Sequence, residues 1–319
     1  MTIGPRTTGV LTRDRPTMYF IGVTTGQSSI TRLFPEWVKL LGLGDAELVG
    51  VDLPLHADPD RYRQAVAQIK HDPLSLGALV TTHKVDLLEA ARDLFDDLDR
   101  YAALCNEVSN IAKRDGRLVG FAKDPITAGR TLGEMLKPRY WDSGGHLLCL
   151  GVGGTTAAIA AYLLTRPDRG DRPRRFVAVN RSHRGLDNLR SVVEQVGTDV
   201  DIEYLLNEDP RRNDALLGDL PPGSLVVNAT GMGKDRTGSP VTDAATFPPR
   251  GIVWELNYRG ELEFLRLANS QQVVRDLQVH DGWRYFVHSW VEHIAEVFRL
   301  EVTPELITRL AQAAERVRV

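Results

Sequence analysis

The stretch "HLLCLGVGGTTAAIAAYLL", residues 146–164, constrains the fold of this chain more than any other. An apolar run that enters a glycine turn and continues as an apolar segment of helical length predicts a strand, a tight turn and a buried helix. Gly151 permits the turn, and Gly153 lets the backbone approach a pyrophosphate. Thr156 replaces the third glycine of the GxGxxG pattern, so the flanking elements have to support the prediction.

The residues that follow give that support. Apolar runs at 175–180, 201–206, 224–230 and 251–256 predict further strands, with helical patterns between them. Strands that alternate with helices favour a parallel sheet with helices on both faces. We therefore predict a Rossmann domain, in which the helix N-terminus at Gly154 and Thr155 faces the anionic dinucleotide.

The second strand of this unit ends in "VAVNRSHRG", and its residue types indicate which dinucleotide binds. An NAD site usually places Asp or Glu there for the ribose 2′-hydroxyl, whereas this chain has Asn180. A guanidinium suits a 2′-phosphate, so the sequence favours NADP. The predicted cofactor residues beyond the glycine turn are Asn180, Arg181, Ser182 and Arg184, with Ala229, Thr230, Gly231 and Met232 beside the nicotinamide.

The first half of the chain also alternates between strands and helices. Strands are predicted at 17–23, 46–55 and 76–82, and helices at 31–43, 58–71 and 85–95. Asp58 or Asp60 would open the second of these helices. The alternation of strands and helices then stops, because the pattern of residues 107–124 predicts a β-hairpin with its turn at Asp115-Gly116. Asp124 and Pro125 follow as the N-cap and first residue of a helix, and two helical patterns close the chain.

We predict an α/β protein of two domains, with the active cleft between them. Residues 17–123 and 282–319 form an N-terminal substrate-binding and catalytic domain with a mostly parallel sheet. Residues 124–281 form the Rossmann domain. Residues 1–16 are polar and are predicted to be a mobile extension.

Composition excludes several classes of function. A net charge of -3 gives no electrostatic case for binding nucleic acid or an anionic membrane. No apolar run approaches the roughly 20 residues of a membrane span. The two cysteines show no metal-binding spacing, and Cys149 reads as core filler, which fits a reducing cytoplasm. We expect a cytoplasmic enzyme for a small molecule and leave open whether it is a monomer or a homodimer.

Lys84 stands between a predicted strand and a predicted helix, in "LVTTHKVDLLEAA". The helix dipole disfavours a cation at this end, so the placement calls for a reason. Strand ends line clefts in α/β proteins, and a lysine there can move a proton. A base role would require the pKa of Lys84 to fall well below its ordinary value of about 10.4. An exposed surface lysine is the alternative.

Together these motifs resemble the shikimate dehydrogenase family. The resemblance runs from about Tyr19 to about Phe298 and is strongest in "GVGGTTAAIAAYLL", "VNRS", "VVNATGMG" and "GRLVGFAKD". It implies a substrate domain and an NADP-binding domain, and the interconversion of a ring ketone and a secondary alcohol. It also implies that Lys84 is the catalytic lysine, that Asp124 is its aspartate partner, and that Ser28 and Tyr258 bind substrate.

Other substrate positions depart from the family pattern. The second serine position holds Ile30, an asparagine position holds Leu79, and another asparagine falls on Ser109. The late glutamine falls on Ser289, and the shortened "TTHK" leaves Thr81 as an approximate match. Ala122 and Lys123 replace the two polar residues before Asp124.

These departures fall on groups that would hold ring hydroxyls and a carboxylate. We therefore predict a compact cyclic polyol ketone or alcohol other than the housekeeping substrate, used in aromatic amino acid or secondary metabolite biosynthesis. Two alternatives remain. One is a catalytically lapsed NADP-binding sensor or partner-binding protein. The other is a reductase of a carbon–nitrogen double bond.

Overall fold

The computed structural model describes residues 10–234 and 236–318, which fall into two compact units. Of the described residues, unit 1 contains 10–123 and 287–318, and unit 2 contains 124–234 and 236–286. The unit boundaries lie at the start of one helix and inside another, so the chain passes between units through helices. Within the described ranges, no helix is long and apolar enough to cross a lipid bilayer.

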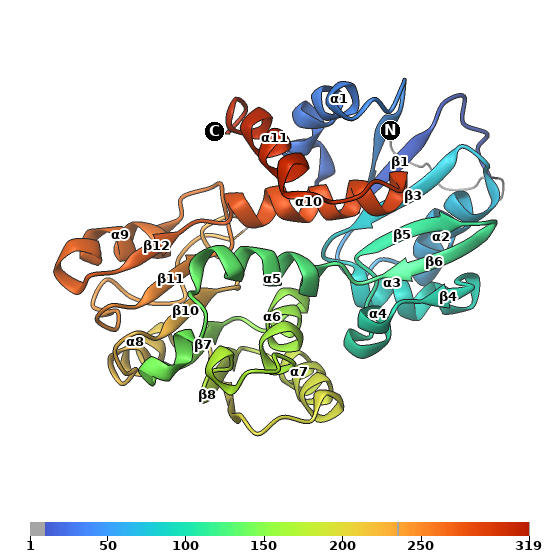
Figure 1. Cartoon of the computed structure of the whole chain (residues 1–319). Helices are drawn as coiled ribbons and strands as arrows, with labels where there is room; N and C mark the ends of the chain where they lie inside the picture. The colour runs from blue at the N-terminus through green and yellow to red at the C-terminus, as the bar shows by residue number, and fades with distance from the viewer. Residues whose placement is uncertain (1–9, 235, 319) are drawn as a thin grey trace. The chain divides into compact units, whose positions relative to one another are not determined.

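Unit 1 contains a mixed sheet in the order β2-β1-β3-β5-β6-β4. Strands β1, β2 and β3 run parallel, whereas β5 and β6 form the antiparallel hairpin drawn in Figure 1. The strands are β1 (Thr17–Gly22), β2 (Glu47–Asp52), β3 (Ser75–Val80), β4 (Asp97–Leu98), β5 (Asn110–Arg114) and β6 (Arg117–Phe121). The helices are α1 (Ile30–Leu41), α2 (Pro59–His71), α3 (Lys84–Ala91), α4 (Arg100–Cys105), α11 (Pro304–Glu315) and the unit 1 part of α10 (Trp283–Phe298).

The side chains of β1 point alternately to the two faces of the sheet, and other elements cover both faces. Tyr19 and Ile21 face a core with α2, α3 and α4. Phe20 points to the other face, where its ring meets that of Trp290 from α10 with centroids 5.0 Å apart. Successive strand residues face opposite sides, so β1 is buried on both faces.

Local signals predicted several of these boundaries. The side chain of Asp58 accepts a hydrogen bond from the backbone of Asp60 and caps α2, as its sequence position indicates. The hairpin turn lies at Asp115-Gly116, with φ of 53° and 81°. Positive φ at both central positions is the backbone that a tight two-residue hairpin requires, so this prediction is confirmed. Asp124 is the first residue of α5 in the structure rather than the residue before it.

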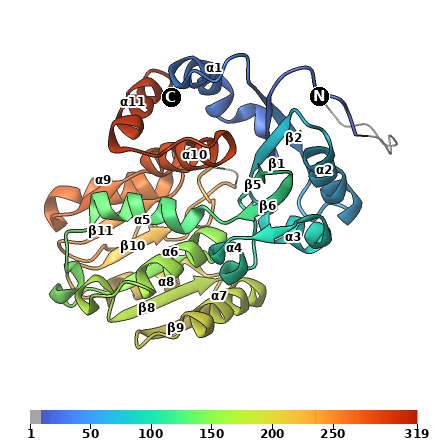
Figure 2. The ribbon, with the colours of Figure 1, turned by 45° about the vertical axis from the view of Figure 1, so that its right-hand side comes forward.

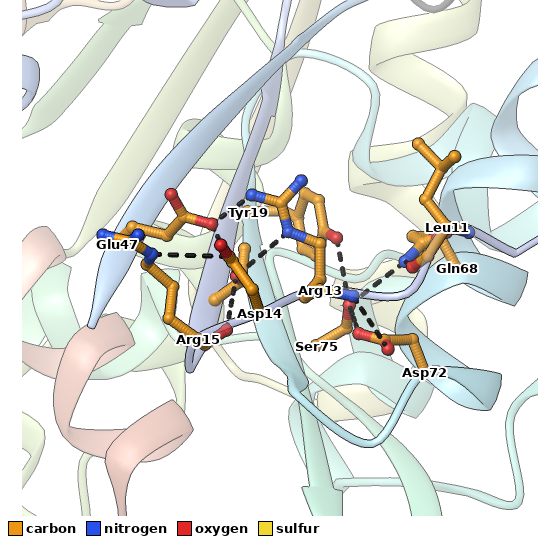
Figure 3. Close-up of polar contacts among 10 residues, drawn as sticks. Leu11, Arg13, Asp14, Arg15, Tyr19, Glu47, Gln68, Asp72 and Ser75 are labelled. Atoms are coloured by element: carbon orange, nitrogen blue, oxygen red, sulfur yellow. Dashed lines mark hydrogen bonds and ion pairs between the residues drawn. The ribbon is translucent and has the colours of Figure 1, made fainter. Parts of the chain in front are cut away.

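A polar cluster attaches residues 11–15 to unit 1 (Figure 3). The backbone of Leu11 exchanges two 2.7 Å hydrogen bonds with the side-chain amide of Gln68. Arg13 forms an ion pair with Glu47, and its backbone N–H donates to Asp72. Residues 1–9 of the predicted mobile extension lie outside the described residues, and the mobility of the extension stays a prediction.

Unit 2 contains a parallel sheet in the order β12-β11-β10-β7-β8-β9. Its strands are β7 (Leu147–Leu150), β8 (Arg175–Asn180), β9 (Asp201–Leu206), β10 (Leu225–Asn228), β11 (Ile252–Glu255) and β12 (Gln278–His280). Its helices are α5 (Asp124–Met135), α6 (Gly154–Leu164), α7 (His183–Val196), α8 (Pro210–Gly218), α9 (Glu263–Arg275) and the start of α10. This is the strand order of the Rossmann fold, as predicted.

The central strands of unit 2 are buried on both faces. Leu147 and Cys149 pack in one core with α5, α6 and α7, and Leu148 and Leu150 pack in another with α8 and α9. Figure 2 shows the strands lying between these helices. Burial on both faces explains why the strands read as continuous apolar runs, and it confirms Cys149 as core filler.

We expect Phe176→Ala to destabilise unit 2 by about 3–5 kcal/mol, because the ring is fully buried beside the sheet and its removal leaves a cavity. Chemical denaturation followed by tryptophan fluorescence measures this loss. Val273→Ala is the matched control, since Val273 is 92% exposed on α9 and its truncation should change stability by less than about 0.5 kcal/mol. Equal effects of the two variants would contradict the assigned core.

Candidate functional site

The glycine turn lies at the carboxyl end of β7, where the strand order of unit 2 reverses. From β7 the chain proceeds to β8 on one side and later returns to β10 on the other. Open α/β sheets bind ligands at this switch point. Gly151 has φ of 92°, and a Cβ built there would lie 2.7 Å from the carbonyl carbon and oxygen of Ala229. Only glycine allows the two backbones to come this close.

The backbone at Gly153 borders open space beside the start of α6. Gly153 precedes α6, and the described atoms leave at least 4 Å of open space around a Cβ built on it. Gly153, the N-cap residue of α6, has no side chain that could cap the first turn. The buried Thr156 hydroxyl donates to the Gly151 carbonyl at 2.7 Å, so the residue in the third glycine position closes the turn. The backbone N–H groups of Gly154 and Thr155 begin a helix suited to an anion.

Asn180, the last residue of β8, supports this turn. Its side-chain oxygen accepts from the Val152 N–H at 3.3 Å, and its amide nitrogen donates to the Ser182 carbonyl at 3.0 Å. The predicted cofactor residue therefore holds two loops together. Arg181, Ser182 and Arg184 are exposed immediately beyond it.

A second loop of the predicted cofactor site, Ala229–Met232, follows β10. The Ala229 N–H donates to the Leu150 carbonyl at 2.7 Å, which joins this loop to the end of β7. Asn228 accepts from the Thr230 N–H and hydroxyl, at 3.1 and 2.7 Å. Asn257 donates to the Met232 carbonyl at 3.1 Å.

Sequence reasoning missed the carboxylate that links these two asparagines. Glu255, fully buried at the end of β11, accepts from Asn228 at 2.6 Å and from the backbone and side chain of Asn257 at 2.8 and 2.6 Å. Burial raises the pKa of Glu255 to about 7, although the hydrogen bonds from Asn257 and Asn228 lower it. The available signal was a polar residue at the end of each of two apolar runs, "SLVVN" and "GIVWE".

In unit 1, Lys84 is the first residue of α3, directly after the turn that leaves β3. Thr82 in this turn has φ of 59°, a conformation that β-branched residues rarely adopt. The Val108 N–H donates to the Lys84 carbonyl at 3.2 Å, and the Thr81 N–H donates to Ile21 at 2.9 Å. Strained backbone held by surrounding contacts is common at functional sites.

Buried hydrogen bonds hold His83, the neighbour of Lys84. Its Nε2 lies 3.1 Å from the Leu53 carbonyl, which can only accept, so Nε2 carries the proton. Its Nδ1 then accepts from the Tyr62 hydroxyl at 3.1 Å, and burial lowers the pKa of His83. Both ring nitrogens of His83 are therefore engaged in local hydrogen bonds.

Comparisons with known proteins agree with this geometry, although no family model matches the chain. The shikimate dehydrogenase (NADP(+)) of Streptococcus gordonii is 27% identical over 223 residues, 69% of this chain and 72% of that protein. A shikimate dehydrogenase solved in complex with NADP+ has a TM-score of 0.71 at 18% identity, over 99% of this chain and 100% of the other. A 5-ketofructose reductase of Gluconobacter sp. strain CHM43 has a TM-score of 0.63 at 17% identity, over 95% and 99%. The chain is therefore similar to shikimate dehydrogenases in sequence and in fold.

Most of the substrate positions predicted in unit 1 follow β1 or lie in and after β3. Ser28 is partly exposed after β1, and Ile30 is buried at the start of α1. Leu79 is buried opposite Asn110 in the sheet, and Thr81 follows β3. Ser289 lies partly exposed on α10.

Ser109 has a structural partner. Its buried hydroxyl accepts from the Lys123 N–H at 2.8 Å, and the Lys123 ammonium forms an ion pair with Glu296 of α10. Ser109 and Lys123, which both differ from the family pattern, are therefore connected by a hydrogen bond.

The remaining predicted residues belong to unit 2. Asp124 is buried at the start of α5. Tyr258 packs against Phe286 and Trp283, with ring centroids 4.6 and 5.4 Å away. Because Lys84 lies in unit 1, its pairing with Asp124 stays a prediction.

We expect Gly151→Ala to destabilise the chain by more than about 1 kcal/mol, because the new methyl group meets Ala229 and φ is positive. Gly153→Ala is the matched control and should change stability by less than about 0.5 kcal/mol, since its Cβ enters open space. Thermal and urea unfolding of both variants measure the difference. A tolerated alanine at position 151 would show that the close approach is not required.

Proposed function

We propose that this chain is an NADP-dependent oxidoreductase that interconverts a ketone and a secondary alcohol on a small cyclic polyol-type substrate. The observation that carries the proposal is the glycine turn at the switch point of the unit 2 sheet, with exposed arginines beyond the neighbouring strand. The similarity to a shikimate dehydrogenase (NADP(+)) and to one solved with NADP+ supports both the reaction class and the cofactor.

The residues of unit 2 suit NADP. Gly153 leaves room for the pyrophosphate, and the backbone N–H groups of Gly154 and Thr155 can donate to it. Ser182, Arg181 and Arg184 would hold the 2′-phosphate, with Asn180 placing their loop. The backbone of residues 229–232 would border the nicotinamide. When bound, the reduced cofactor supplies the hydride.

Lys84 would move the proton. In reduction its ammonium protonates the developing alkoxide, and in oxidation the neutral amine accepts the hydroxyl proton. The turn around Thr82 and His83 orients the start of α3, which limits the positions that the Lys84 stem can take. Asp124 would orient the ammonium and accept a hydrogen bond from a substrate hydroxyl.

The substrate would differ from shikimate. Ile30 and Leu79 offer no hydrogen bonds at two polar positions of the family, and the Ser109 hydroxyl already accepts from Lys123. Each polar group of a substrate that is buried without a partner costs about 1–3 kcal/mol. A less oxygenated ring is therefore favoured. The fold likeness to a 5-ketofructose reductase is consistent with ketone reduction on another polyol.

We expect Lys84→Met to lower kcat at least about 100-fold, because general acid–base catalysis contributes about 10²–10⁴-fold. NADPH oxidation with a panel of cyclic ketones, and NADP+ reduction with shikimate and less oxygenated cyclic alcohols, measure turnover. Lys39→Met, an exposed lysine on α1, should leave kcat unchanged.

Three other outcomes of this experiment would change the proposal. Tight NADPH binding without turnover on any substrate would indicate a lapsed enzyme that senses cofactor or binds a partner. Turnover only with cyclic imines would indicate reduction of a carbon–nitrogen double bond. Full activity of Lys84→Met would remove the lysine from the mechanism.

We expect the double variant Arg181→Gln, Arg184→Gln to bind NADPH about 10–100-fold more weakly, because a hydrogen bond to a charged group contributes about 1.5–3 kcal/mol. Affinity for NADH should stay within about twofold, since NADH lacks the 2′-phosphate. Fluorescence titration measures both. Arg190→Gln is the control on α7, because Arg190 pairs with Asp187 and lies over the Tyr204 ring. Equal losses for NADPH and NADH would contradict the assigned phosphate site.

A further inference from the structure

The carboxylate of Glu255 connects two strand ends to the loop that follows one of them. Asn228 and Glu255 are direct neighbours in the register of β10 and β11, at the carboxyl edge of the unit 2 sheet. The Glu255 side chain is fully buried, and it receives three N–H donors on its two oxygens. Three N–H donors favour the ionised form of a carboxyl, because protonation removes one acceptor site and adds an O–H donor.

The orientation of both asparagines follows from backbone groups. The Thr230 N–H can only donate, so the Asn228 side-chain oxygen faces it and the amide nitrogen faces Glu255. The Met232 carbonyl can only accept, so the Asn257 amide nitrogen faces it. The same nitrogen lies 2.6 Å from Glu255. Neither amide can turn to accept a proton from Glu255 without breaking its bond to the loop.

Through Asn228 and Asn257, Glu255 is linked to Thr230 and Met232 of the loop after β10. Thr230 is held by Asn228, and Met232 is held by Asn257 and by the Thr230 hydroxyl at 3.1 Å. Protonation of Glu255 would remove its charge and turn one acceptor site into an O–H donor, which would weaken these links. The ionised carboxylate is thus the common partner of the groups that order residues 229–232.

We propose that Glu255 is a positioning residue, whose ionised carboxylate holds the segment Ala229–Met232 in the form that receives the dinucleotide. This inference rests on the proposed function, since the ligand of that segment is the proposed NADP. Glu255 itself has no assigned contact with cofactor or substrate. It acts through Asn228 and Asn257.

The proposal implies that acid weakens cofactor binding. The pKa of Glu255 is raised to about 7 by its burial, and the nearby charge of Asp281, after β12, adds to the rise. Burial also lowers the pKa of the neighbouring His280. Asn228 and Asn257, which contact the carboxylate directly, do not titrate.

A rise in pH is expected to lower the stability contribution of Glu255 and to raise the affinity for cofactor. A carboxyl with a raised pKa binds its proton more tightly in the folded chain than in the unfolded chain. Its contribution to the free energy of unfolding therefore falls as the pH rises from about 4.5 to about 7. Order of the segment and affinity for cofactor should rise over the upper part of the same range.

We expect the Kd of the full chain for NADPH to rise about tenfold between pH 8 and pH 6, because only the ionised fraction is competent. Glu255→Gln should bind NADPH about tenfold more weakly at pH 8 and lack this added pH dependence. The 2′-phosphate of the cofactor titrates in both proteins, so the difference between their profiles isolates Glu255. Fluorescence titration provides both profiles, and Glu203→Gln on β9 is the matched control.

Amide hydrogen exchange without cofactor gives an independent readout. The Thr230 and Met232 amides of the unaltered chain should exchange faster at pH 6 than at pH 8 after correction for intrinsic rates, and faster still in Glu255→Gln at pH 8. Exchange that is unchanged by pH and by the substitution would overturn the proposal. NADPH binding with identical pH profiles in both chains would overturn it and leave the proposed function intact. Absence of NADPH binding by the unaltered chain would overturn both.

Discussion

The contact between Gly151 and Ala229 is the constraint on which the organisation of unit 2 depends. At this point the backbone that leaves β7 passes the backbone that leaves β10, and a side chain on Gly151 would overlap the carbonyl of Ala229. The Ala229 N–H donates to Leu150 immediately beside it. This close passage brings the glycine turn and the loop 229–232 to the same edge of the sheet, where an extended ligand can contact both.

Buried polar groups hold the loops that carry predicted site residues in both units. Glu255 and two asparagines order the loop after β10, and the Tyr62–His83–Leu53 hydrogen bonds order the turn before Lys84. In each case a side chain supplies the partner that an irregular backbone lacks. Burial strengthens such bonds and makes the loss of a partner costly, so these loops have few alternative conformations.

Local chemistry was readable from the sequence, and contacts between distant residues were not. The cap at Asp58, the turn at Asp115-Gly116 and the strand–glycine–helix motif depend on neighbouring residues, and each is present in the structure. The short strands β4 (Asp97–Leu98) and β12 (Gln278–His280) were not predicted, because neither contains a clear apolar pattern. Their pairing with β6 and β11 creates them.

The sequence by itself determined the alternation of elements, the parallel Rossmann sheet and the positions of its glycines, because these follow from hydrophobic periodicity and backbone sterics within short segments. It also placed Asn180, followed by two arginines, where an acidic residue would mark NAD. Only the tertiary structure showed that Ser109 accepts a hydrogen bond from the Lys123 backbone, that His83 faces Tyr62, and that Glu255 accepts from Asn228 beside the loop after β10. Each of these roles depends on a partner 14 or more residues away along the chain, and the chain brings such partners together only when its sheets assemble.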